Sequence, residues 1–245
     1  MDLDQAFSER LQEIEAYIDL LEAMERQLSI GPPHIGGSVI TVRQQRILYS
    51  SVYLQLYNLI EATATWCLGA VAQAASSGEW RPLDLSAKLR REWVKGIART
   101  SVSLNEDHRL EATVSFCNLL LKADPIAPWD VVAGGGGNWD DSVLEAITER
   151  LGCELAISPP VKTAAKRVIR DDRGSLALVK HLRNKLAHGE MSFEECGNGV
   201  TVADLKDIKD RTANYLREVV ASFNWFIEHR YFIDAERRPY VGEGI

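Results

Sequence analysis

The eight residues from Arg183 to Glu190, RNKLAHGE, place five polar side chains around the end of a predicted helix. Asn184 and His188 are four residues apart and therefore share a helix face, and the long Arg183 side chain can reach the same space. A neutral imidazole can take the proton of a ribose 2′-hydroxyl, and a guanidinium can bind the phosphate oxygens whose charge grows as that hydroxyl attacks. These residue types favour RNA cleavage, because DNA lacks the nucleophile.

A structural role explains the same residues. Arg183 and Lys185 can interact with the exposed carbonyls of a helix C-terminus, with His188 as the cap. In the catalytic interpretation, the Arg183 charge favours an unprotonated His188, and Asn184 orients the ring or the phosphate. We expect no metal and no cofactor, because the Cys and His residues are dispersed and the carboxylates after the motif lack a second acidic cluster.

Apolar residues recur at helical spacing and predict an all-α protein. The expected architecture is an up-and-down bundle of long helices in a single domain over residues 1–245, with a less regular insertion at about 76–160. The run GGGGN, at 134–138, lacks the GK[ST] ending of a phosphate loop, so we interpret it as a loop with Asn138 capping the next helix. We expect MSFEECGNGVTV, after the motif, to form a short hairpin or loop. The expected helices cover about 3–28, 41–74, 86–99, 106–122, 139–152, 174–187 and 202–229.

The formal net charge of −7 argues against a protein that coats nucleic acid indiscriminately. Eight Lys or Arg residues nevertheless fall between positions 162 and 185, against two acidic residues. This basic stretch could focus positive charge beside the motif, with Arg170, Arg173 and Lys180 as RNA-binding residues, although an ordinary solvated helix face is the alternative. The acidic N-terminus and the absence of a long apolar run favour a cytoplasmic protein that does not enter a membrane.

An Arg, four residues and then a His at a helix end resembles the R-x4-6-H signature of the HEPN superfamily of RNA-cleaving helical domains. Further segments are similar to bacterial MAE-type HEPN nucleases, and the similarity covers most of the chain. They are RNKLAHGEMSFEECG with the following VADL, YNLIEATATWCL, the GN ahead of WDDSVLEAITERLG, and the N-terminal amphipathic helix.

This resemblance implies that Arg183 and His188 are the catalytic pair and that Asn184 is the variable polar member. It gives Glu61 a supporting role, although Glu61 could equally pair with a basic residue inside the bundle. Lys185, between the two residues of the pair, and Glu190, two residues after His188, are further supporting candidates. Glu190 stands where better-known HEPN toxins have a tyrosine, so inactivation by nucleotidylation of that tyrosine is not expected.

The resemblance also implies an assembly and a biological role. Activity in the family belongs to a dimer that brings two motifs face to face, so we expect a homodimer or a heterodimer with a paralogous HEPN protein. Typical roles are a toxin, restrained by an antitoxin protein, or an effector of phage defence. Two alternatives stay open: a catalytically inactive HEPN module that binds a nucleotide or protein partner, and a purely structural scaffold. We place His181 roughly opposite His188 on the helix, in a surface or packing position.

Overall fold

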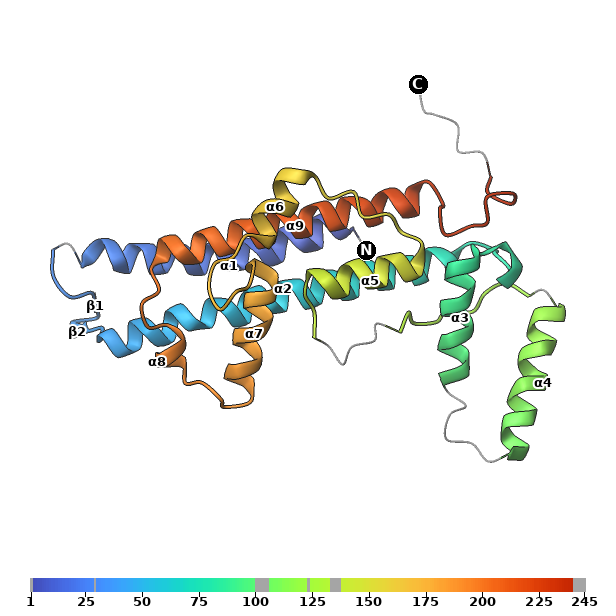
Figure 1. Cartoon of the computed structure of the whole chain (residues 1–245), viewed down its shortest axis with the longest axis horizontal. Helices are drawn as coiled ribbons and strands as arrows, with labels where there is room; N and C mark the ends of the chain where they lie inside the picture. The colour runs from blue at the N-terminus through green and yellow to red at the C-terminus, as the bar shows by residue number, and fades with distance from the viewer. Residues whose placement is uncertain (1, 29, 100–105, 123, 133–137, 240–245) are drawn as a thin grey trace, which may run out of the picture.

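The computed structural model describes residues 2–28, 30–99, 106–122, 124–132 and 138–239. Three long helices form its body: α1 (Leu3–Gln27), α2 (Val42–Ser77) and α9 (Val202–Glu228). Each of the three packs against the other two, and α1 runs opposite to α2 and α9 (Figure 1). The prediction of an all-α fold is therefore confirmed.

Each long helix begins where its sequence supplies a cap. Thr41 and Gln44 form a capping box at the start of α2, and Thr201 and Asp204 form another at the start of α9. The Asp2 carboxylate caps α1. The apolar positions then face the core at helical spacing, and those buried on α1 are Leu3, Phe7, Leu11, Ile14, Ile18, Leu21 and Met24.

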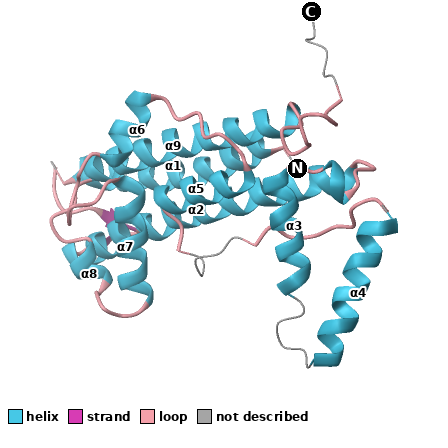
Figure 2. Cartoon of the chain, turned by 45° about the vertical axis from the view of Figure 1, so that its right-hand side comes forward, coloured by secondary structure: helices cyan, strands magenta, loops and turns pink. Residues whose placement is uncertain are grey.

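Shorter elements cover one side and one end of this body. A small antiparallel hairpin joins α1 to α2, and α3 and α4 project away from the long helices (Figure 2). None of the helices in the described ranges combines the length and hydropathy of a membrane span. The shorter elements are β1 (His34–Ile35), β2 (Ser38–Val39), η1 (Pro82–Asp84), α3 (Ala87–Arg99), α4 (Glu106–Lys122), α5 (Asp141–Leu151), α6 (Pro159–Lys166), α7 (Ser175–Ala187) and α8 (Phe193–Cys196).

The segment after the motif differs from the expected hairpin or loop. Residues Phe193–Cys196 form the helical turn α8, which begins in a capping box between Ser192 and Glu195. This turn packs closely on α2: a Cβ added at Gly197 would lie 2.0 Å from the Arg46 carbonyl oxygen. Only glycine allows that approach, so Gly197 belongs to a helix–helix contact and not to a hairpin turn.

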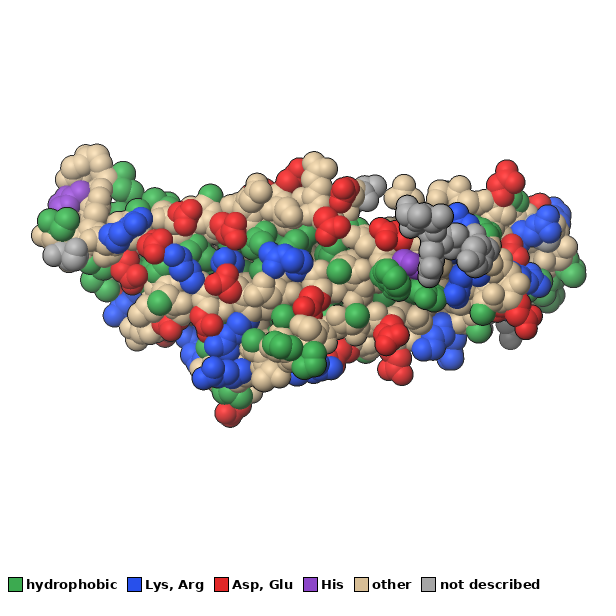
Figure 3. All heavy atoms as spheres, turned by 90° about the horizontal axis from the view of Figure 1, so that it is seen from above, with side chains coloured by type: hydrophobic (Ala, Val, Ile, Leu, Met, Phe, Trp, Pro, Cys, Tyr) green, Lys and Arg blue, Asp and Glu red, His purple; other side chains and the backbone are tan. Residues whose placement is uncertain are grey.

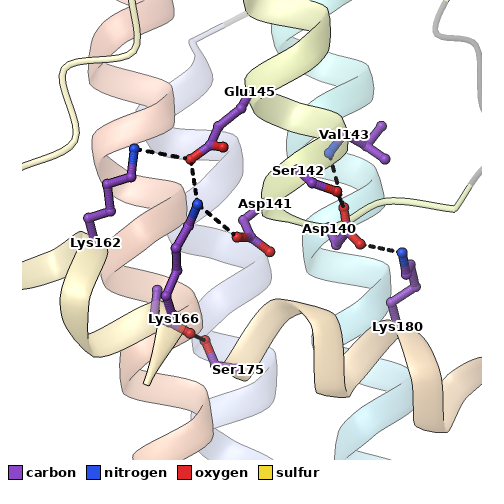
Figure 4. Close-up of polar contacts among 10 residues, drawn as sticks. Asp140, Asp141, Ser142, Val143, Glu145, Lys162, Lys166, Ser175 and Lys180 are labelled. Carbon is purple, nitrogen blue, oxygen red and sulfur yellow. Dashed lines mark hydrogen bonds and ion pairs between the residues drawn. The ribbon is translucent and has the colours of Figure 1, made fainter. Parts of the chain in front are cut away.

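Part of the predicted insertion is joined to the body through a buried ion pair. Glu92 on α3 is 3% exposed and pairs with Arg150 on α5. Burial alone would raise the pKa of Glu92, but Arg150 and Lys95 bind its ionised form and lower that pKa. Helix α3 is thereby attached to α5, whose first turn lies beside the motif helix α7 (Figure 4).

Candidate active site

Helix α7 ends in a Schellman motif that fixes the backbone around His188. The Glu190 N–H donates to the Lys185 carbonyl at 2.9 Å, and the Gly189 N–H donates to the Leu186 carbonyl at 3.3 Å. Gly189 has a φ of 72°, the left-handed conformation that this ending requires. His188 is the C-cap residue and is exposed. The imidazole therefore leaves a well-defined helix end where a substrate can reach it.

Arg183 lies just over one turn before His188 and packs its guanidinium on an aromatic ring. Its Cζ atom is 4.2 Å from the centroid of the Tyr57 ring on α2, a cation–π contact. Its Nη1 donates a hydrogen bond to Asn184 Oδ1 at 2.9 Å, and no other hydrogen bond uses its N–H groups within the described residues. The guanidinium is half-buried and keeps donors for a phosphate.

The residues just before α5 contact both helices that carry these side chains. Asn138 Oδ1 accepts a hydrogen bond from Asn184 Nδ2 at 3.0 Å. The next backbone N–H, that of Trp139, donates to Tyr57 Oη at 3.3 Å. Tyr57 and Asn184 both contact the Arg183 guanidinium, so the segment is bonded to two of its neighbours.

Asp140, and not Asn138, is the N-cap of α5, which corrects the predicted cap. Its carboxylate accepts from Ser142 Oγ at 2.6 Å and from the Val143 N–H at 3.0 Å, and it pairs with Lys180 of α7 (Figure 4). Burial alone would raise the pKa of Asp140, but these three donors bind the ionised form and lower that pKa. Asp140 therefore joins α5 to α7. Positions 134–137 of the predicted loop lie outside the described residues.

Carboxylates of α5 offset part of the basic stretch. Lys166 pairs with Glu145 at 3.0 Å and with Asp141 at 3.5 Å, and Lys162 pairs with Glu145 at 3.3 Å (Figure 4). Lys180, proposed from the sequence to bind RNA, is engaged with Asp140 and is 27% exposed. On the face shown in Figure 3, Lys and Arg side chains lie along the length of the molecule among scattered carboxylates. The positive charge beside the motif is thus smaller than the sequence count implies.

Arg170 and Arg173 flank a tight turn that leads into α7. Its central residues, Asp171 and Asp172, both have a φ of 54°, which is uncommon for residues with a side chain. The Arg173 N–H donates to the Arg170 carbonyl at 3.0 Å. The Arg170 Cζ lies 6.0 Å from the Tyr53 ring centroid, and Arg173 Nη1 donates to the Asp171 carbonyl at 2.5 Å. Both proposed RNA-binding arginines are therefore held at the start of the motif helix.

The expected position of His181, opposite His188, is wrong. Seven residues span nearly two full helical turns, so the two histidines lie on the same side of α7. His181 Nε2 is 3.9 Å from Asp171 Oδ2. Burial and the nearby charges of Arg173 and Lys185 lower the pKa of His181, which favours its neutral form.

The three supporting candidates, Glu61, Lys185 and Glu190, are less closely linked to Arg183 and His188 than Asn184 is. Glu61 is half-buried on α2, one turn after Tyr57, but no hydrogen bond or ion pair in the described part of the chain joins its carboxylate to Arg183 or His188. Lys185 is half-buried, and Glu190 is exposed. The supporting role of Glu61 therefore continues to rest on the resemblance alone.

The sequence did not identify Tyr57 or Trp139 as site residues, and it predicted Asn138 to be a helix cap. Tyr57 is 2% exposed and is spaced like any other apolar residue of α2. Nothing in the sequence distinguishes a ring that also stacks on an arginine. The sequence does allow Asp140 to be predicted as the N-cap, because an Asp directly before a helix is as good a cap as an Asn.

The fold is mainly all-α, as HEPN domains are. A family model described as HEPN_MAE_28990-like HEPN matches residues 1–232. The chain belongs to this family. No curated protein and no solved structure matches it. HEPN domains include nucleases and nucleotide-binding modules, and some members are inactive.

Proposed function

We propose that the chain is a metal-independent endoribonuclease that cuts RNA by attack of a 2′-hydroxyl on the adjacent phosphorus. The observation that carries this proposal is the Arg183 guanidinium, held over the Tyr57 ring, with N–H donors that no other hydrogen bond among the described residues uses, just over one turn from an exposed His188. A charged donor fixed before substrate binds stabilises charge that develops in the transition state. An inert helix cap requires no such support for its arginine.

In the proposed reaction, neutral His188 removes the 2′-hydroxyl proton while Arg183 binds the non-bridging phosphate oxygens. The O2′–P bond forms, the P–O5′ bond breaks, and the leaving 5′ oxygen takes up a proton. The products are a 2′,3′-cyclic phosphate and a 5′-hydroxyl, and no water is consumed. Asn184 supports Arg183 through the hydrogen bond to its guanidinium.

One chain offers a single motif histidine, whereas the reaction needs a base and an acid. We therefore propose a symmetric homodimer, or a heterodimer with a paralogous HEPN protein, in which two α7 ends share a cleft. Arg170, Arg173 and Lys185 would lie along the approach to that cleft and attract RNA. In the cell the activity would serve as a toxin restrained by an antitoxin protein, or as an effector of phage defence.

The decisive experiment incubates the purified protein with end-labelled RNA in EDTA. We expect cleavage that continues in the chelator, with cyclic-phosphate and 5′-hydroxyl ends, and no cleavage of a 2′-O-methyl copy of the same RNA. Products with 5′-phosphate ends would indicate water attack and contradict the proposed mechanism. Absence of cleavage for every RNA tested would instead favour an inactive HEPN partner module.

A further inference from the structure

We propose that Tyr57 and Asn138 are positioning residues, which hold Arg183 and Asn184 in the orientation that binds the scissile phosphate. The inference deepens the proposed ribonuclease function and rests on it. Neither residue belongs to the Arg183–His188 motif: Tyr57 comes from α2, and Asn138 precedes α5. Both nevertheless contact the motif directly.

Tyr57 supports the Arg183 guanidinium from one side. The Arg183 Cζ lies 4.2 Å from the ring centroid, and the Tyr57 ring is 2% exposed, so core packing holds the ring in place. A guanidinium held over a ring face keeps N–H groups at its edge, where two can bind one phosphate. The Trp139 N–H donates to Tyr57 Oη and holds the ring from its far end.

Asn138 holds the end of the Asn184 amide that points away from the arginine. The Arg183 guanidinium can only donate, so Asn184 turns its Oδ1 toward Arg183 Nη1 at 2.9 Å. The opposite end, Nδ2, then donates to Asn138 Oδ1 at 3.0 Å. Without Asn138, the Nδ2 end loses this acceptor, and the amide that supports the guanidinium is held from one end only.

The segment that supplies these contacts has a rigid base. Asp140, two residues after Asn138, caps α5 and pairs with Lys180 on α7 (Figure 4). On the other side of the same helical turn, Lys166 of α6 pairs with Asp141 and Glu145. The start of α5 is therefore joined to α6 and α7 by ion pairs. These ion pairs should keep Asn138 close to Asn184.

A double-mutant cycle tests whether Asn138 acts through Asn184. We expect Asn138→Ala to lower kcat about 10-fold to 100-fold with little change in KM, because a small misplacement of a catalytic group has effects of this size. The double variant Asn138→Ala/Asn184→Ala should be no slower than Asn184→Ala alone. Losses that multiply would mean that Asn138 acts independently and would overturn its positioning role.

Two substitutions of Tyr57 separate the ring from its hydroxyl. Tyr57→Phe keeps the aromatic face under Arg183 and should retain most of kcat, whereas Tyr57→Leu should lose most of it. Tyr49→Leu is the matched control: Tyr49 is buried on the same helix, and its ring makes no cation–π contact among the described residues. If Tyr49→Leu and Tyr57→Leu lose stability and kcat alike, Tyr57 has only a packing role and the proposal fails.

A readout without turnover distinguishes failure of this inference from failure of the proposed function. The Tyr57 ring current should shift the Arg183 side-chain proton resonances in the wild-type protein, and Tyr57→Leu should abolish that shift. Asn138→Ala should broaden or move the Asn184 side-chain amide signals. If these signals respond as expected in a protein that cleaves no RNA, the arrangement stands and the ribonuclease proposal fails. If the wild-type Arg183 signals show no ring-current shift, the positioning role is overturned.

Discussion

The Glu190 N–H donates to the Lys185 carbonyl at 2.9 Å, and this bond closes the Schellman motif around His188. The closure depends on Gly189, whose φ of 72° places it in the left-handed region. The direction in which the His188 side chain leaves the helix is thus set by a glycine that has no chemistry of its own. This relationship links backbone conformation to the proposed activity.

Gly189→Ala should therefore impair cleavage more than it impairs folding. A non-glycine residue in this conformation costs about 1–2 kcal/mol, and relief of that strain would turn the backbone at His188. Gly199→Ala is the matched control, because Gly199 has a φ of 70° and, like Gly189, has open space around an added Cβ. Both variants should lose similar stability in urea denaturation, and only Gly189→Ala should lose RNA cleavage. Equal activity of the two would show that the Schellman closure does not position His188.

The Asp140–Lys180 ion pair should make the free energy of unfolding depend on pH. The folded-state pKa of Asp140 is lowered, so its contribution to stability is complete above the unfolded-state pKa of about 3.9 and is lost as pH falls through the folded value. Asp140→Asn keeps a good N-cap but removes the charge, and we expect it to lose about 1–3 kcal/mol at pH 7. The difference in free energy of unfolding between Asp140→Asn and wild type should disappear below about pH 4. Urea denaturation at pH 7 and pH 3 measures the free energy of unfolding of the variant and of wild type. A difference between them that does not change with pH would contradict a stabilising role of the ionised Asp140.

The sequence predicts the long helices well because each has caps and a periodic apolar face. The start of α9 at Val202, for instance, agrees with the apolar residues at helical spacing that begin at Leu205, and Thr201 caps it. It predicts the neighbours of the motif poorly, since the Asn138–Asn184 contact joins residues 46 positions apart. Counting charges along the sequence overestimates the positive charge beside the motif for the same reason. The carboxylates that pair with Lys166 and Lys180 come from α5 and its N-cap, outside the basic stretch.

The buried Glu92–Arg150 ion pair should be essential for attaching α3. Arg150→Met leaves the Glu92 carboxylate, 3% exposed, without its nearest cation, and we expect a loss of about 3–5 kcal/mol. Lys95→Met is the matched control, because Lys95 approaches the same carboxylate at 3.4 Å but is 53% exposed, and its loss should be below about 1 kcal/mol. Thermal denaturation compares the two variants. Similar melting temperatures would mean that solvent or another group replaces Arg150.

Arg183→Ala and His188→Ala should each abolish cleavage while the fold is kept. His188 is exposed and Arg183 is half-buried at a helix end, so neither truncation opens a large core cavity. Loss of a proton-transfer group typically lowers a rate by about 10²–10⁴-fold. Circular dichroism and melting curves check the fold, and RNA cleavage in EDTA checks the activity. Near-wild-type cleavage by either variant would remove that residue from the proposed mechanism.

The proposed dimer makes the most specific prediction, because it states which chain supplies which group. If Arg183 of one chain works with His188 of the other, an Arg183→Ala chain paired with a His188→Ala chain keeps one intact combination. In an equal mixture that exchanges freely, half of the dimers are mixed, and each keeps one Arg183 and one His188 in the shared cleft, so cleavage should return only in part, below about one quarter of the wild-type rate. Each variant alone should stay inactive, and differently tagged chains should copurify to show exchange. A mixture that exchanges but stays inactive would show that the two chains do not complement each other, and full-rate cleavage by a monomer at micromolar concentration would overturn the shared cleft.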